Sequence, residues 1–359
     1  MKNKLLLSSA LISGLMVGGS AIAQTTISGD LAIAFKSQSY DASAGAGSKR
    51  GFGRESQVNV QNKGKLSNGM NYAAGFSLEF DGNARTNTTG ATSMTSAGVE
   101  ANSISNENVY IDIEITPGTT ITAGVDHIQN ITREIPQVLS QMDHVAAGLG
   151  SLAVNTVGAN PKENFGIGVV QVIPGTGLTA SYNYTPNGGD FGSTDQAADA
   201  TSNGRNSAYE YGIVGVNAFG VQGLGLSFFK NNEDKDVVSG TSDIEGRAYT
   251  ISYAAKGFTG GYSEHKQNRE SSTATADKEL KMKQIAVTYA ATKDITIGLS
   301  QLKTENETAT KVDETIRSLQ IGYNLGPVAL IVSASDAEDL ANTAGNDAKE
   351  IGIRLSTKF

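Results

Sequence analysis

Apolar and polar residues alternate along much of this chain with a period of two. In residues 109–115, every odd position is Val or Ile, whereas Asp112 and Glu114 occupy even positions. The final eleven residues, 349–359, alternate in the same way. Successive side chains of a β-strand point to opposite faces, whereas a helix would scatter these residues around its axis. The pattern therefore predicts strands with one apolar and one polar face.

Sixteen such segments can be counted along the chain. Most are close to the 9–11 residues that a tilted strand needs to cross a bilayer. The expected strands are 24–35, 52–62, 70–81, 104–115, 119–126, 163–173, 177–186, 207–218, 221–230, 247–255, 258–267, 279–290, 294–303, 314–324, 327–335 and 348–359.

The connections between these segments alternate in length. The short connections consist of turn residues at 116–118, 173–176, 219–220, 256–257, 292–293 and 325–326. Long polar segments lie between them at 36–51, 82–103, 187–206, 231–246, 268–278, 304–313 and 336–347. Tight turns at one end and long loops at the other are typical of outer-membrane barrels. We therefore expect an all-β fold, a transmembrane antiparallel up-and-down β-barrel of sixteen strands with short periplasmic turns and long extracellular loops.

The first 23 residues have the features of a cleaved secretory signal peptide. Lys2 and Lys4 precede a thirteen-residue apolar run, and Ala21 and Ala23 form a small-x-small cleavage site. The apolar run is too short for a membrane-spanning helix. The expected mature barrel is then residues 24–359, exported through the periplasm to the bacterial outer membrane.

Composition narrows the remaining choices. Removing the two lysines of the signal moves the formal net charge from −8 to −10, which does not favour a nucleic-acid partner. The chain has no cysteine, so disulfides cannot hold an exported fold together. Mean hydropathy is −0.22, as expected where lipid-facing residues occupy every second position. A soluble all-β repeat protein would also alternate, but no fixed repeat period is present.

Three local features carry a family resemblance. A strand pattern begins directly after the cleavage site, at 25–31, and the chain ends on the aromatic Phe359. The insert at 127–162 is too apolar for a freely solvated loop. With this layout the chain resembles the general bacterial porins, which are trimeric sixteen-stranded outer-membrane channels. The family's Pro-Glu-Phe-Gly-Gly stretch is absent from the insert.

The resemblance implies several further expectations. The insert at 127–162 would be a third loop folded into the lumen, where it narrows the pore; the alternative is a short helix capping the outer mouth. Phe359 would be the signal that the barrel-assembly machinery reads. The chain would form a homotrimer in contact with outer-membrane lipid and lipopolysaccharide.

Charged residues are expected to set the selectivity of such a pore, since ions lose less solvation beside opposite charge. The expected constriction residues lie on or beside the insert: Asp126, His127, Arg133, Glu134, Asp143 and His144. Strand parity predicts that Asp112, Glu114, Arg354 and Lys358 line the lumen. Each of these side chains, taken singly, fits ordinary polar barrel lining better than a dedicated site.

The sequence therefore predicts passive diffusion of small hydrophilic solutes and ions through a water-filled pore with mild cation preference. A substrate-specific channel for phosphate or sugars and a non-conducting adhesin or structural barrel are the alternatives. No hydrolase motif, dinucleotide fingerprint before a helix or close metal-ligand spacing is present. We expect neither an enzyme nor a cofactor, and at most weak Ca²⁺ binding by the acidic outer loops.

Overall fold

The computed structural model describes residues 23–41, 47–83, 105–124, 165–185, 205–235, 244–269, 278–306 and 312–359. Within these ranges the chain forms sixteen strands. They are β1 (Gln24–Tyr40), β2 (Gly47–Lys65), β3 (Asn71–Asn83), β4 (Ser105–Thr116), β5 (Thr119–Gly124), β6 (Gly166–Ile173), β7 (Leu178–Thr185), β8 (Arg205–Val216), β9 (Leu224–Lys235), β10 (Ile244–Ala255), β11 (Phe258–Arg269), β12 (Lys278–Ala290), β13 (Ile295–Asn306), β14 (Glu314–Asn324), β15 (Val328–Glu338) and β16 (Ala348–Lys358).

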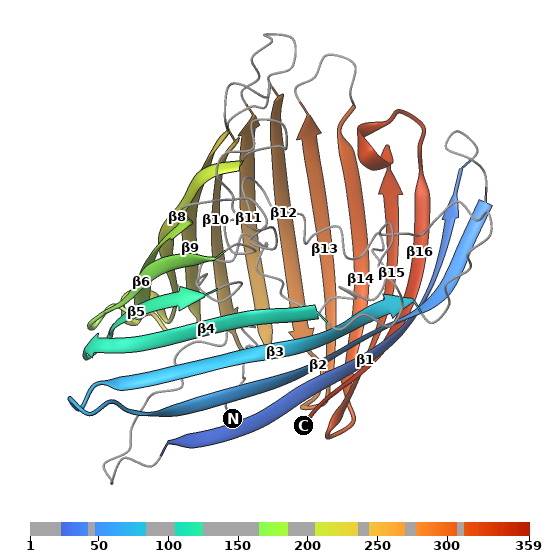
Figure 1. Ribbon diagram of the computed structural model, residues 1–359. Coiled ribbons are helices and arrows are strands. Elements are labelled where there is room, and N and C mark those ends of the chain that lie inside the picture. The colour runs from blue at the N-terminus through green and yellow to red at the C-terminus, as the bar shows by residue number, and fades with distance from the viewer. Residues whose placement is uncertain are drawn as a thin grey trace.

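The sixteen strands form one closed antiparallel barrel in which sequence neighbours are also neighbours in space. β1 closes the ring by pairing with both β2 and β16, the latter in a register that runs from Asp30 opposite Lys358 to Tyr40 opposite Ala348. Closure leaves no sheet edge, so each strand has a partner on both sides. In Figure 1, β1–β4 cross the front of the barrel at a shallow slant and β10–β16 stand more upright. The predicted all-β fold and strand number are confirmed.

Tight turns join the strands at one end, the turn end, which is the lower end in Figure 1. β4 and β5 are joined by Pro117 and Gly118 alone, and β10 and β11 by Lys256 and Gly257. Both residues of the second turn have positive φ, 49° and 83°. This geometry matches the twist of the paired strands and places a glycine where its freedom is needed. The connections at the opposite end, the loop end, are all longer than these two turns.

Several strands extend further toward the loop end than the sequence predicted. β1 continues to Tyr40, β9 to Lys235 and β15 to Glu338, into segments expected to be polar loops. The turn between β8 and β9 is longer than the predicted pair at 219–220 and includes a short 3₁₀ segment, Ala218–Gly220. Among the described residues, no helix is long and apolar enough to cross a membrane.

The connection between β15 and β16 folds back onto the barrel. It contains the 3₁₀ turn Leu340–Asn342, and Leu340 packs against side chains on the inside of the barrel. The Asn342 amide donates to the carbonyl oxygens of Thr304 and Val312, at 3.0 and 2.9 Å. This predicted loop is therefore ordered, held by contacts with the β13–β14 side of the mouth.

Candidate pore lumen

The strands separate the side chains into an inner and an outer set. Inward positions carry mainly small and polar residues, and their neighbours along each strand point outward and are apolar. The buried polar and charged residues on the inward face, here called the inner wall, include Lys36, Gln38, Ser77, Glu79, Asn183, Glu210, Asn231, Thr250, Ser263, Gln284, Thr304, Glu314, Gln320, Ser333 and Glu350. A closed sheet with this distribution has a polar interior and a hydrocarbon-compatible exterior.

Carboxylates dominate the buried charges of the inner wall. Glu79, Glu210, Glu314 and Glu350 are each at most 6 % exposed, and Lys36 is the buried lysine among the described residues. Glu350 accepts a hydrogen bond of 2.7 Å from the Gln38 amide, and Gln38 in turn accepts one from Tyr40. Glu314 accepts one of 3.1 Å from the Thr304 hydroxyl. These bonds fix two of the carboxylates against the wall.

Two of the four predicted lumen residues lie beside buried residues of the inner wall. Asp112 is in register with Ala73 and Thr122, both buried on the inward face. Arg354 is in register with the buried Ala34 and Ile331.

The other two predicted lumen residues lie near the turn end. Glu114 accepts hydrogen bonds from the Asn71 amide, at 2.7 Å, and from the backbone N–H of Gly118, at 3.1 Å, so it also braces the β4–β5 turn. Lys358 is in register with Asp30 and is exposed.

The predicted constriction lies outside the described residues. This holds for Asp126, His127, Arg133, Glu134, Asp143 and His144, and for the whole insert at 127–162. Their role in narrowing the pore stays a prediction, as does cleavage of the signal segment.

An apolar patch on the inner wall was not foreseen from the sequence. Met282, Leu302, Ile316, Ala337 and Ala348 pack together, with Tyr40 and Leu340 against them. Each strand contributes one residue to the patch, so no single segment shows it. Only the cross-strand register brings these residues together.

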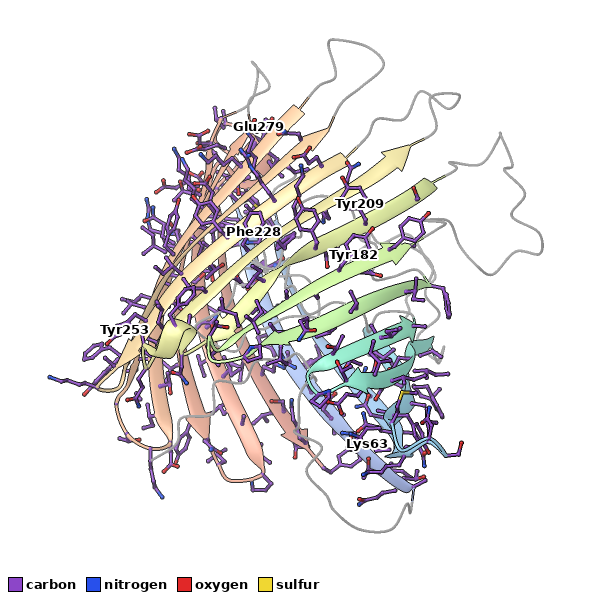
Figure 2. All side chains as sticks on the ribbon, turned by 90° about the vertical axis from the view of Figure 1, so that its left-hand side faces the viewer. Lys63, Tyr182, Tyr209, Phe228, Tyr253 and Glu279 are labelled. Atoms are coloured by element: carbon purple, nitrogen blue, oxygen red, sulfur yellow. The ribbon has the colours of Figure 1, made fainter. Side chains whose placement is uncertain are left out.

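The outer wall carries an apolar belt bordered by aromatic rings. Figure 2 looks onto this wall at β6–β9, where Tyr182, Tyr209 and Phe228 lie. Phe258 and Tyr289 stack near the turn end with ring centroids 4.5 Å apart, and Tyr249 and Tyr262 meet nearer the loop end at 6.2 Å. Aromatic side chains favour the two interfaces of a bilayer. The belt therefore marks the membrane-embedded height of the barrel.

Ion pairs between neighbouring strands lie on the outer wall, on the loop-end side of this belt. Lys230 contacts Glu245 at 2.9 Å, Lys283 contacts Glu305 at 2.6 Å, and Arg317 contacts Glu338 at 2.6 Å. These pairs continue the sheet beyond the apolar belt, toward the loop end, where Glu279 lies (Figure 2). They replace the apolar alternation that marks the membrane-embedded part of each strand.

The first and last strands meet in a seam. The backbone N–H of Gly29 donates to the carbonyl oxygen of Phe359 at 2.9 Å, and the Phe359 N–H donates to Gly29 at 3.0 Å. The Phe359 ring lies over Gly29 on the outer wall, within 2.6 Å of where a Cβ on Gly29 would stand. The C-terminal residue thus has a place in the closed barrel, while its reading by an assembly machinery stays a prediction.

Comparison with known proteins agrees with this architecture. A family model described as Gram-negative porin matches residues 8–334. The chain belongs to this porin family. Membership of this family and the closed sixteen-stranded barrel together place this porin in the bacterial outer membrane. A search of curated proteins gave no match.

Solved porin structures share the fold at low sequence identity. An anion-selective porin from Comamonas acidovorans superposes with a TM-score of 0.68 at 11 % identity, covering 94 % of this chain and all (100 %) of that one. A mutant of the Rh. blastica porin superposes with a TM-score of 0.57 at 16 % identity, covering 94 % of this chain and 100 % of that one. At such identities the likeness concerns the fold alone.

Proposed function

We propose that this porin forms a water-filled channel for passive diffusion of small hydrophilic solutes and ions, with mild cation preference. The observation that carries the proposal is the polar inner wall enclosed by a fully closed sheet. Such a wall offers hydrogen-bonding groups to water and solutes, while the apolar outer wall matches hydrocarbon. The porin acts as a passive channel, not as an enzyme, and needs no cofactor.

Charge on the inner wall supports cation preference. Among the described residues, the buried charges of this wall are four carboxylates and one amine. The outer-wall charges, by contrast, are largely paired across strands. Excess negative charge facing the lumen lowers the desolvation cost of cations relative to anions. The selectivity of the Comamonas acidovorans porin does not transfer to this chain, because only the fold is shared at 11 % identity.

The proposed assembly is a homotrimer in the outer membrane. Its partners are outer-membrane lipid, lipopolysaccharide and, during insertion, the barrel-assembly machinery. The described residues contain no group of three or more His, Asp or Glu side chains that could hold a metal ion. Any Ca²⁺ binding would therefore fall to the acidic outer loops and be weak.

Ion preference is tested by reversal potentials in a planar bilayer under a KCl gradient. The potential should have the sign of a channel that passes K⁺ more readily than Cl⁻. Clear anion preference would overturn the proposed cation preference. Any measurable conductance would still support the proposal that the porin forms a channel.

Liposome swelling with sugars of increasing size separates the alternatives. A general pore gives uptake that is linear in concentration and falls smoothly with solute size. Saturable uptake of one solute class, such as phosphate or a sugar, would identify a substrate-specific channel. A reconstituted barrel without any conductance would be an adhesin or a structural protein.

A further inference from the structure

The outer wall of β12–β16 changes abruptly from charged to apolar between two rows of side chains. Each row consists of residues in direct register on the five neighbouring strands. The upper row, toward the loop end, is Ile285, Gln301, Arg317, Asp336 and Lys349. The lower row, toward the turn end, is Val287, Leu299, Leu319, Ala334 and Ile351.

A groove of about 720 Å³ runs between these two rows. Its floor is the backbone of the row in between, Ala286, Ser300, Ser318, Ser335 and Glu350, whose side chains point inward. Ala334 deepens the groove, because it stands in the lower row between Leu319 and Ile351 and fills little space. The groove thus lies on the outer wall, with one polar and one apolar side.

Neighbouring rows place the groove at the edge of the membrane's hydrocarbon core. Below the lower row, the next outward row is apolar throughout: Tyr289, Ile297, Ile321, Val332 and Ile353. Above the upper row, Lys283, Lys303 and Glu338 project outward. Hydrocarbon chains favour the lower side and hydrated headgroups favour the upper side.

The groove also interrupts the aromatic border of the belt. On β7–β11 the loop-end border is formed by Tyr182, Tyr211, Phe228, Tyr249 and Tyr262. On β12–β16 the corresponding positions carry no aromatic side chain. Rings that would occupy the interface are missing over the five strands where the groove lies, so the space is open to another amphiphile.

The two basic side chains of the upper row differ in whether they already form an ion pair. Arg317 binds Glu338 through both terminal nitrogens, at 2.6 and 3.5 Å. Lys349 is exposed and forms no ion pair in the described part of the chain, although Asp336 is its neighbour in register. Lys349 is therefore the basic group at the upper row that is available to an anionic headgroup.

We propose that this groove binds a phosphate-bearing lipid of the outer leaflet. An acyl chain lies along the lower row and over Ala334, and the phosphate oxygens accept hydrogen bonds from the Lys349 ammonium. Arg317 adds positive potential at the same height. The proposal rests on the membrane placement of the proposed pore and assigns its lipid contact to one surface. It does not depend on ion conduction.

The chain has no tryptophan, so one introduced Trp is a unique fluorescent reporter. We suggest Leu319→Trp in the groove and Val169→Trp on β6 as its matched control. The two replaced side chains are similarly exposed, 41 % and 37 %. Toward the loop end, Leu319 is followed by Arg317, whereas Val169 is followed by Ile167, which is in register with Tyr184. Each full-length mature porin is reconstituted in vesicles that contain phosphatidylglycerol or phosphatidylcholine with dibrominated chains, which quench Trp on contact.

We expect quenching of the Leu319→Trp reporter to show about fivefold stronger relative association of brominated phosphatidylglycerol than of brominated phosphatidylcholine. This is the preference for anionic lipid that one basic group at a membrane surface gives. Adding Lys349→Gln should abolish this preference, and the Val169→Trp reporter should show none. Equal quenching by both lipids at Leu319→Trp would overturn the proposal. Absence of quenching by either lipid would also overturn it, because a second protein surface would then cover the groove. Conductance of the same samples tests the pore separately.

Discussion

Replacing Gly29 with alanine should weaken the seam between β1 and β16. A Cβ at this position would stand 2.5 Å from the carbonyl oxygen of Gln57 and 2.6 and 2.9 Å from two ring atoms of Phe359. Real side chains do not approach so closely, so the ring and the β1–β2 backbone must both move. Overpacking of this kind costs about 1–3 kcal/mol. The free energy of unfolding of Gly29→Ala should fall by this amount.

Gly260→Ala provides a matched control. Gly260 also lies inside a strand, β11, and points outward, but a Cβ there meets no atom within 4 Å. Where the native backbone accepts a side chain, Gly→Ala stabilises by about 0.4–1 kcal/mol through the unfolded chain. The two substitutions should therefore change stability in opposite directions.

Urea unfolding in lipid vesicles, followed by the gel mobility of folded and unfolded chains, measures both effects. Part of the Gly29→Ala cost should be recovered by Phe359→Ala, since the ring contact is then gone. A double-mutant cycle isolates this coupling. The reasoning about the seam would be refuted if Gly29→Ala were as stable as Gly260→Ala.

Three further changes probe the outer wall, the last loop and the lumen. Ile321→Arg places a charge in the apolar belt and should lower the free energy of unfolding in vesicles by about 2–4 kcal/mol. Ser356→Arg, on the inner wall, should be tolerated. Equal losses of stability in the two variants would contradict the assignment of the two faces. Asn342→Ala removes the two side-chain hydrogen bonds to the carbonyl oxygens of Thr304 and Val312 and should destabilise the loop locally by about 1–2 kcal/mol. Proteinase K should then cleave within 339–347 faster than it does in the control Ala344→Ser. Unchanged cleavage would show that these hydrogen bonds do not hold the loop. Glu350→Gln should reduce the permeability ratio of K⁺ to Cl⁻ about twofold. The ratio is measured by reversal potential, with the outer-wall variant Glu338→Gln as the control. An unchanged ratio would show that Glu350 does not contribute to selectivity.

Period-two alternation was sufficient to predict the sixteen strands, and the alternating lengths of their connections predicted closure into a barrel. The apolar alternation failed as a guide where strands run past the membrane. Residues 231–235 and 304–306 were expected in loops, yet they belong to β9 and β13. Charged residues such as Glu305, which pairs with Lys283 of β12, take the outward positions there. Strand pairing continues in water without an apolar face, so the hydrophobic pattern ends before the strand does.

The site was predictable only in part, for a related reason. Parity within a strand assigned Asp112 and Arg354 to the face on which the structure places them, the inner wall, while their role in the pore stays a prediction. It could not single out Glu79, Glu210 or Glu314, because each is one carboxylate among small polar residues on its own strand. Their significance appears when the register assembles them on one surface. The Phe359 contact with Gly29 likewise depends on closure between the two ends of the chain.

The central claim is that the sheet separates water inside from hydrocarbon outside, and adjacent residues of β16 test it most directly. Ser356 points inward and is half-buried, whereas Leu355 points outward and is 47 % exposed. The chain has no cysteine of its own, so Ser356→Cys and Leu355→Cys each carry one thiol. In single-channel recordings, a water-soluble, charged methanethiosulfonate should lower the conductance of Ser356→Cys and leave that of Leu355→Cys unchanged. A barrel that shows no conductance, or one in which only the Leu355→Cys channel responds, would contradict the account.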